Sequence, residues 1–76
     1  FPNMTDNFNE NAKVYVDIVV TPSGKVINPS IARGTTTTNS RLRSIAIEKA
    51  ESLKFNPTST GNNETGTILF NFVLKN

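Results

Sequence analysis

The chain has 76 residues, no cysteine and no histidine, and a formal net charge of +2. A chain of this length forms one small domain, and it lacks the thiolate and imidazole groups that most metal sites and neutral-pH catalytic bases use. Two excess positive charges are weak support for nucleic-acid binding, and no stretch approaches the roughly 18 to 20 apolar residues of a membrane span. Because the chain begins at Phe1, we expect it to be a domain of a longer protein.

Residues 1–12 are rich in Asn and Asp, which bond to their own backbone and favour turns. Phe1, Met4 and Phe8 fall at helical spacing. The composition nevertheless favours an irregular arm whose apolar side chains cover an edge or a face of a sheet.

The first predicted strand follows at 14–20, where apolar residues alternate so that Val14, Val16, Ile18 and Val20 share the core face. Thr21 to Gly24 then predicts a hairpin turn, because proline presets its first position and glycine accepts a positive φ. A second strand is expected over 25–32, with Ile27, Pro29 and Ile31 on one face. Pro29 cannot donate to a ladder, so this strand should be an edge.

Four consecutive threonines at 35–38 neither pack a core nor start a helix well. Ser40 to Lys54 predicts an amphipathic helix, capped by Asn39 or Ser40 and ended by Pro57, with its apolar face formed by Leu42, Ile45, Ala46, Ala50 and Leu53. Arg41 and Arg43 lie in its first turn, where a solvated basic face is the ordinary interpretation.

The last predicted strand runs over 66–75 and places Ile68, Phe70, Phe72 and Leu74 inward. A helix of about fifteen residues is long enough to return the chain along the second strand by a right-handed crossover. The predicted fold is therefore α+β, a β-β-α-β core over 13–76 in which the first strand lies between the second and the third, all neighbours are antiparallel, and one helix covers one face. Six side chains should be nearly fully buried: Val16, Ile18, Ile45, Leu53, Phe70 and Phe72.

No catalytic or cofactor-binding constellation is present. Asp17 projects from the outer face of a strand, Glu48 and Glu51 lie on a solvated helix face, and the glycines have no phosphate-binding spacing. We expect neither an enzyme nor a cofactor nor a metal. The last strand has no proline or mid-strand charge, so its outer edge is the candidate site for pairing with another chain. The candidate partner-binding residues are Thr67, Leu69, Phe70, Asn71, Phe72 and Val73, with Arg41 and Arg43 as auxiliary contacts.

Several motifs occur in an order that resembles the C-terminal domain of TonB energy transducers. These are VYVDIVVTPSGKV at 14–26, the helix positions Leu42, Ala46 and Ala50, Lys54-Phe55-Asn56-Pro57, and the terminal TGTILFNFVLKN. The run GTTTTN at 34–39 is similar to a subgroup common in Bacteroidetes, and Phe1-Pro2 stands where the family often carries an aromatic-proline pair. The resemblance covers essentially the whole chain.

The resemblance implies a periplasmic domain that an upstream segment anchors to the inner membrane. Its partners would be the short N-terminal box of TonB-dependent outer-membrane transporters, which pairs with the last strand, and, through upstream segments, the proton-driven motor proteins of the inner membrane. An adaptor domain of another bacterial envelope protein is the alternative. A nucleic-acid-binding domain, using Arg33, Arg41, Arg43 and Lys49, is less favoured because only Tyr15 offers an outward aromatic. A second copy of the chain is a further candidate partner for the exposed strand.

Overall fold

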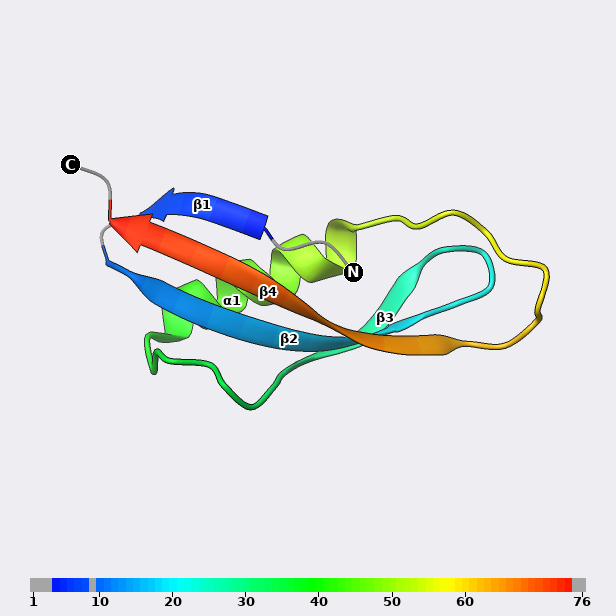
Figure 1. The fold of residues 1–76 in the computed structure, drawn as a ribbon, viewed down its shortest axis with the longest axis horizontal. Helices are drawn as coiled ribbons and strands as arrows, with labels where there is room; N and C mark the ends of the chain where they lie inside the picture. The colour runs from blue at the N-terminus through cyan, green and yellow to red at the C-terminus, as the bar shows by residue number, and fades with distance from the viewer. Residues whose placement is uncertain (1–3, 9, 75–76) are drawn as a thin grey trace.

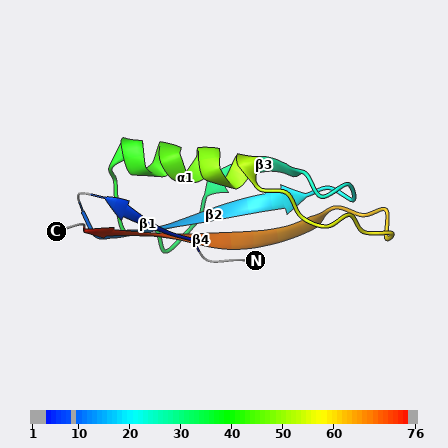
Figure 2. The same cartoon turned by 90° about the horizontal axis from the view of Figure 1, so that it is seen from above.

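The computed structural model describes residues 4–8 and 10–74, which form four strands and one helix (Figure 1). The sheet has the order β1-β4-β2-β3. α1 lies along one face of this sheet (Figure 2). The elements are β1 (Met4–Phe8), β2 (Ala12–Val20), β3 (Val26–Ile31), α1 (Ser40–Ser52) and β4 (Glu64–Leu74).

The predicted β-β-α-β core is confirmed. β2 lies between β3 and β4 and is antiparallel to both. Its pairing with β4 is unbroken, from Ala12 opposite Phe72 to Val20 opposite Glu64. β2 is internal because β3 pairs with one of its edges and β4 pairs with the other.

The N-terminal arm differs from the expectation. We predicted irregular structure over residues 1–12, but Met4–Phe8 forms β1, which pairs in parallel with β4. The arm therefore lies along a sheet edge through its backbone, whereas Phe1 and the side chains of Met4 and Phe8, which were expected to cover the sheet, lie outside what the structure describes. Asn and Asp disfavour strands, so the local signal is weak, and the strand forms by pairing with an edge that already exists.

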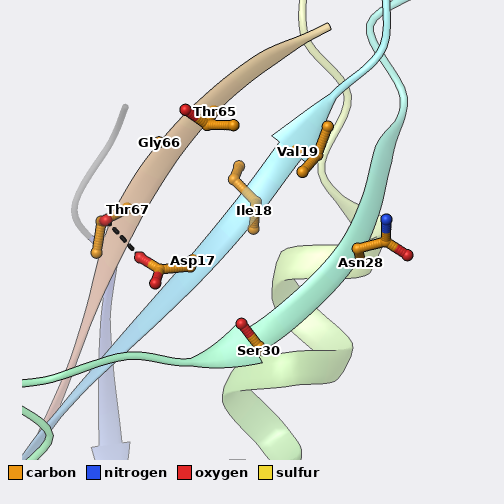
Figure 3. Close-up of a pocket in the computed structure, with 8 residues that line it drawn as sticks. All are labelled: Asp17, Ile18, Val19, Asn28, Ser30, Thr65, Gly66 and Thr67. Carbon is orange, nitrogen blue, oxygen red and sulfur yellow. Dashed lines mark hydrogen bonds between the residues drawn. The ribbon is translucent and has the colours of Figure 1, made fainter.

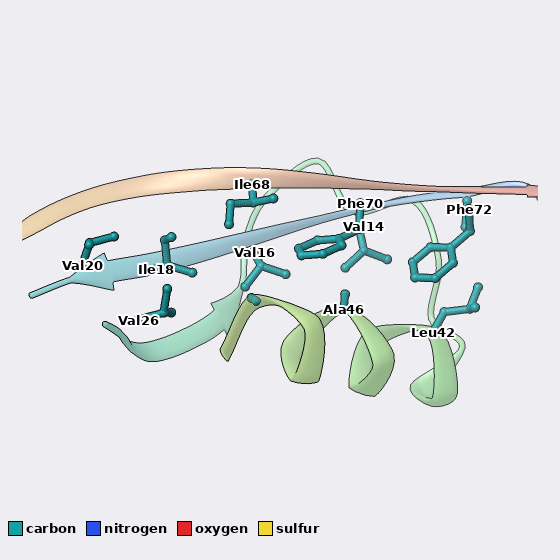
Figure 4. Packing of buried hydrophobic residues seen from close by; sticks show 12 residues of the cluster. Val14, Val16, Ile18, Val20, Val26, Leu42, Ala46, Ile68, Phe70 and Phe72 are labelled. Atoms are coloured by element: carbon teal, nitrogen blue, oxygen red, sulfur yellow. The ribbon is translucent and has the colours of Figure 1, made fainter. Parts of the chain in front are cut away.

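The core lies between α1 and the inner face of β2 and β4 (Figure 4). Val16, Ile18, Phe70 and Phe72 are buried as predicted, each with at most 2% of its surface exposed. Burying such a side chain fully contributes about 1.5 to 3 kcal/mol. From the helix, the buried residues are Leu42, Ala46 and Ala50.

Three predicted core positions are corrected. Ile45 and Leu53 are only partly buried, because the small side chains of Ala46 and Ala50 form the face of α1 that meets the sheet. Leu74 was expected to face inward, but it is 50% exposed. It lies at the end of β4, two residues beyond the last buried side chain of that strand.

β3 contains a bulge that the sequence analysis missed. Ile27 pairs with Val19 and Ser30 pairs with Asp17, so two residues of β3 stand opposite one residue of β2. One of the two, Asn28, has a φ of 51°. The extra residue reverses the alternation, so Val26 and Ile31 pack on the core while Ile27 does not share their face. The prediction of Ile27, Pro29 and Ile31 on one face is therefore wrong.

The threonine run covers the part of the β2 edge that β3 does not reach. Thr36 Oγ1 accepts from the Lys13 amide at 2.9 Å, and Thr35 Oγ1 accepts from the Tyr15 amide at 3.0 Å. The Thr36 amide in turn donates to the Lys13 carbonyl at 2.8 Å. These hydroxyls replace the partners that a neighbouring strand would supply.

The two ends of α1 are fixed by local contacts. Asn39 is the N-cap, as expected, and its Oδ1 accepts from the Arg41 amide at 3.0 Å. The helix ends at Ser52 rather than near Lys54, because the chain then turns to meet the hairpin. There the Phe55 amide donates to the Gly24 carbonyl at 2.8 Å. A Cβ at Gly24 would lie 1.9 Å from the Phe55 carbonyl oxygen, so the close approach requires glycine.

Candidate partner-binding edge

The candidate site is the edge of β4 that faces away from β2. The direction of each backbone group in β4 follows from the hydrogen bonds that β2 makes along its other edge, the one away from β4. The Tyr15 carbonyl accepts from Ala32 at 2.7 Å and the Lys13 carbonyl accepts from Thr36 at 2.8 Å, so both residues direct their backbone groups away from β4. Successive residues of a strand point to opposite edges. Ala12, Val14 and Val16 therefore bond with Phe72, Phe70 and Ile68, the residues opposite them.

The same alternation sets the outward residues of β4. The backbone groups of Thr65, Thr67, Leu69, Asn71 and Val73 point away from β2. A separate hydrogen bond agrees with this assignment, because the Leu74 amide donates to Asn11 Oδ1, on the β2 side, at 2.7 Å. Four of the six predicted binding residues thus present their backbone to the outer edge.

Phe70 and Phe72 do not belong to the surface of the site. Their side chains are 2% and 1% exposed, and their backbone groups face β2. They hold β4 against the core, which positions the edge but leaves no atom for a partner to contact. Side-chain alternation alone does not separate these two from their neighbours, because it does not show which amides of the strand face outward.

β1 divides the outer edge of β4 into two segments. It pairs with β4 from Met4 opposite Phe70 to Phe8 opposite Leu74, so it covers the outward groups of Asn71 and Val73. Among residues 4–8 and 10–74, no strand pairs with the outer side of β4 at 64–69. We call 64–69 the open segment and 70–74 the covered segment. Thr65, Thr67 and the Leu69 amide supply the outward groups of the open segment, because in the parallel pattern the Met4 amide bonds to the Leu69 carbonyl.

A shallow pocket lies beside the open segment, on the sheet face opposite α1 (Figure 3). Thr67 Oγ1 donates to Asp17 Oδ1 across the two strands at 2.6 Å. This bond joins β4 to β2 on the outer face, where Asp17 is exposed. The lining residues of the pocket are Asp17, Ile18, Val19, Asn28, Ser30, Thr65, Gly66 and Thr67.

The structure places Arg43, one of the two predicted auxiliary arginines, away from this edge. Arg43 Nε donates to the Thr37 carbonyl at 3.0 Å, and its side chain lines a groove with Ile31 and Ile47. That groove lies on the β3 side, and β2 separates β3 from β4. Arg41, two positions earlier in α1, points to the other side of the helix from Arg43.

Over residues 4–8 and 10–74, no cluster of three or more His, Cys, Asp or Glu side chains is placed to hold a metal ion. α1 is too short and too polar to cross a bilayer. Comparison of the chain with protein-family models, curated proteins and solved structures found no match. The fold and the edge define the class of the molecule: an α+β domain whose last strand presents backbone groups for strand pairing.

Proposed function

We propose that the chain is the periplasmic interaction domain of a TonB-type energy transducer, and that it binds an extended segment of outer-membrane transporters by strand addition to β4. The observation that carries the mode of binding is the open segment, where Thr65 and Thr67 direct backbone groups outward and no described strand pairs with them. The kind of partner rests on the sequence resemblance, as do the periplasmic location and the upstream anchor in the inner membrane.

The physical basis of binding is backbone hydrogen bonding. Water satisfies the outward amide and carbonyl groups of the open segment, and an extended peptide exchanges that water for its own groups. Each such bond contributes about 0.5 to 1.5 kcal/mol net. Two outward residues and the Leu69 amide therefore support a modest affinity that depends weakly on the side chains of the peptide.

The attachment of β4 also suits transmission of force from the inner-membrane motor proteins. Its inner edge pairs with β2 without interruption from Ala12–Phe72 to Val20–Glu64. The buried rings of Phe70 and Phe72 add a hydrophobic anchor on the α1 side. A load applied along a bound strand would thus be shared by the whole ladder and the core beneath it.

The test removes one outward amide of the open segment. Thr67→Pro removes the amide, and Thr67→Val is the matched control, because both variants lose the hydroxyl that donates to Asp17. The probes are synthetic peptides that carry the N-terminal segments of outer-membrane transporters from the same bacterium. We expect Thr67→Pro to weaken peptide binding by about tenfold or more and Thr67→Val to stay within about threefold of the parent. Circular dichroism checks that each variant is folded.

Parent-like binding by a folded Thr67→Pro variant would refute pairing at the open segment. Binding that is lost equally in both variants would assign recognition to the Thr67 side chain. Sedimentation of the parent without peptide tests the second copy of the chain as a partner, since self-pairing at the same edge would compete with the peptide.

A further inference from the structure

The covered segment suggests how the edge is controlled. We infer that β1 is a resident strand that a partner strand displaces, so that the whole outer edge of β4 becomes the binding surface by strand exchange. The inference rests on the proposed function for the identity of the partner. The strand exchange itself is inferred from the pairing of Met4–Phe8 with Phe70–Leu74.

Fewer interactions hold β1 in the sheet than hold the other strands. It has 5 residues against 9 in β2, and it pairs with β4 alone. The pairing is parallel, which is slightly weaker per residue than antiparallel pairing. Thr5, Asp6 and Asn7 include the two residue types, Asp and Asn, that are depleted in strands. A partner with stronger strand formers can therefore compete for the same groups.

The connection after β1 is fixed independently of β1. Asn11 Oδ1 accepts from the Leu74 amide at 2.7 Å, and Glu10 Oε1 accepts from Asn39 Nδ2 at 2.6 Å, which ties the connection to the N-cap of α1. The start of β2 is thus anchored from both sides. β1 can leave the edge without loss of the β2–β4 ladder, and its tether keeps it at high local concentration for return.

The two segments then act in order. A partner strand first pairs at the open segment, where Thr67 and Leu69 offer outward groups, and it extends to Asn71 and Val73 as β1 leaves. Affinity for the partner is reduced by the fraction of molecules in which β1 covers the edge. Any change that releases β1 should therefore tighten binding.

The first test uses two proline variants of the full chain. Asn71 faces outward and pairs with Thr5, so in the parallel pattern its bonds go to the flanking residues Met4 and Asp6. Asp6→Pro removes an amide that faces β4, whereas Asn7→Pro removes one that faces away and serves as the matched control. Asp6→Asn controls for the lost charge. The probe is a synthetic peptide with the sequence of residues 1–10, compared with a scrambled version, and circular dichroism checks that each variant is folded.

We expect Asp6→Pro to bind the residue 1–10 peptide at least about fivefold more tightly than the parent, Asn7→Pro and Asp6→Asn, because its own β1 no longer competes. Equal binding by all four chains, or no binding by any of them, would overturn strand exchange. The scrambled peptide should bind none of them.

A reversible lock gives a second test that does not depend on proline. Thr5 and Asn71 are paired across β1 and β4, and the chain has no cysteine, so a Thr5→Cys and Asn71→Cys double variant can form one defined disulfide. The probe is a transporter-derived peptide. We expect the oxidised form to bind at least about tenfold more weakly than the reduced form. Asn71→Cys alone, treated in the same way, should show no such difference.

The outcomes separate this inference from the proposed function. If transporter peptides bind the locked and reduced forms equally but lose binding in Thr67→Pro, exchange is wrong and the proposed function stands. If transporter peptides bind no variant but the residue 1–10 peptide distinguishes Asp6→Pro from Asn7→Pro, the proposed function fails and exchange stands.

Discussion

The two outer edges of the sheet are protected by different means. On the β3 side, Pro29 has no amide to donate, and it follows the bulge at Asn28. On the β4 side, Glu64–Leu74 contains neither a proline nor a bulge, and its last five residues pair with β1. Both arrangements are recognised ways to keep an edge from pairing with other chains.

The two kinds of protection differ in reversibility. Proline and the bulge belong to the β3 sequence itself, so the folded chain cannot withdraw them from the edge. β1 is a separate segment, and pairing with it leaves the β4 backbone ready for another strand once β1 departs. The β4 edge is therefore the one suited to regulated binding, and the β3 edge is closed by its own sequence.

The largest expected effect is on the core beneath the β4 edge. Phe70 is 2% exposed, so Phe70→Ala should lower the free energy of unfolding by about 3 to 5 kcal/mol, close to the whole stability of a domain this small. Leu74→Ala, at a position 50% exposed on the same strand, should cost less than about 1 kcal/mol. Chemical denaturation measures both. A loss below about 1 kcal/mol for Phe70→Ala would contradict the packing of β4.

The next effect concerns the β3 side of the sheet, where the threonine run at 35–38 covers the part of the β2 edge that β3 does not reach. Thr35→Val leaves the Tyr15 amide without its hydroxyl partner, and we expect a loss of about 1 to 3 kcal/mol in chemical denaturation. Thr38→Val is the same exchange at an exposed position of the run and should change stability by less than about 0.5 kcal/mol. Equal effects would mean that the hydroxyl of Thr35 does not hold the edge.

A smaller effect is expected at the bulge. Asn28 has a φ of 51°, a left-handed conformation that alanine tolerates less well than asparagine. Asn28→Ala should cost about 1 kcal/mol in thermal or chemical unfolding. Asn28→Gly should be neutral within about 0.5 kcal/mol, because glycine adopts positive φ without strain. A neutral Asn28→Ala would show that the bulge relaxes.

The smallest effect on stability is expected at Pro29. Pro29→Thr returns an amide donor to β3 and should change the free energy of unfolding by less than about 1 kcal/mol. The informative measurement is self-association, read by sedimentation at increasing concentration. We expect more association than in the parent, because the barrier to edge pairing is removed. Unchanged association would mean that the bulge alone closes this edge.

Sequence patterns predicted the elements that bury a face. The alternation at 14–20 and 68–74 and the helical spacing from Leu42 to Ala50 identified β2, β4 and α1, because apolar residues at a fixed period must share one side. A right-handed crossover through α1 then predicted that β2 lies between β3 and β4. The same reasoning missed the bulge, because it assumed an unbroken period of two through Asn28 and Pro29. It also placed the helix end two residues late.

The candidate site was predicted only in part. The choice of strand came from the missing proline and charge in 66–74, and the structure then separates outward Thr67, Leu69, Asn71 and Val73 from inward Phe70 and Phe72. That separation depends on the register between β4 and β2. The alternation of side chains along one strand does not reveal this register. The pocket beside Asp17 and Thr67 was missed, although both are polar residues at outward positions of neighbouring strands.

The sequence by itself determined which residues face the core, because burial of apolar side chains follows a local period that any strand or helix imposes. Only the tertiary structure decided what lies against the outer edge of β4. Backbone amides and carbonyls are the same in every residue except proline. The sequence of an edge strand therefore says almost nothing about which segment pairs with it. Met4–Phe8 occupies the covered segment because the fold brings it there, through a connection anchored by Asn11 and Glu10, and not because its residues favour a strand.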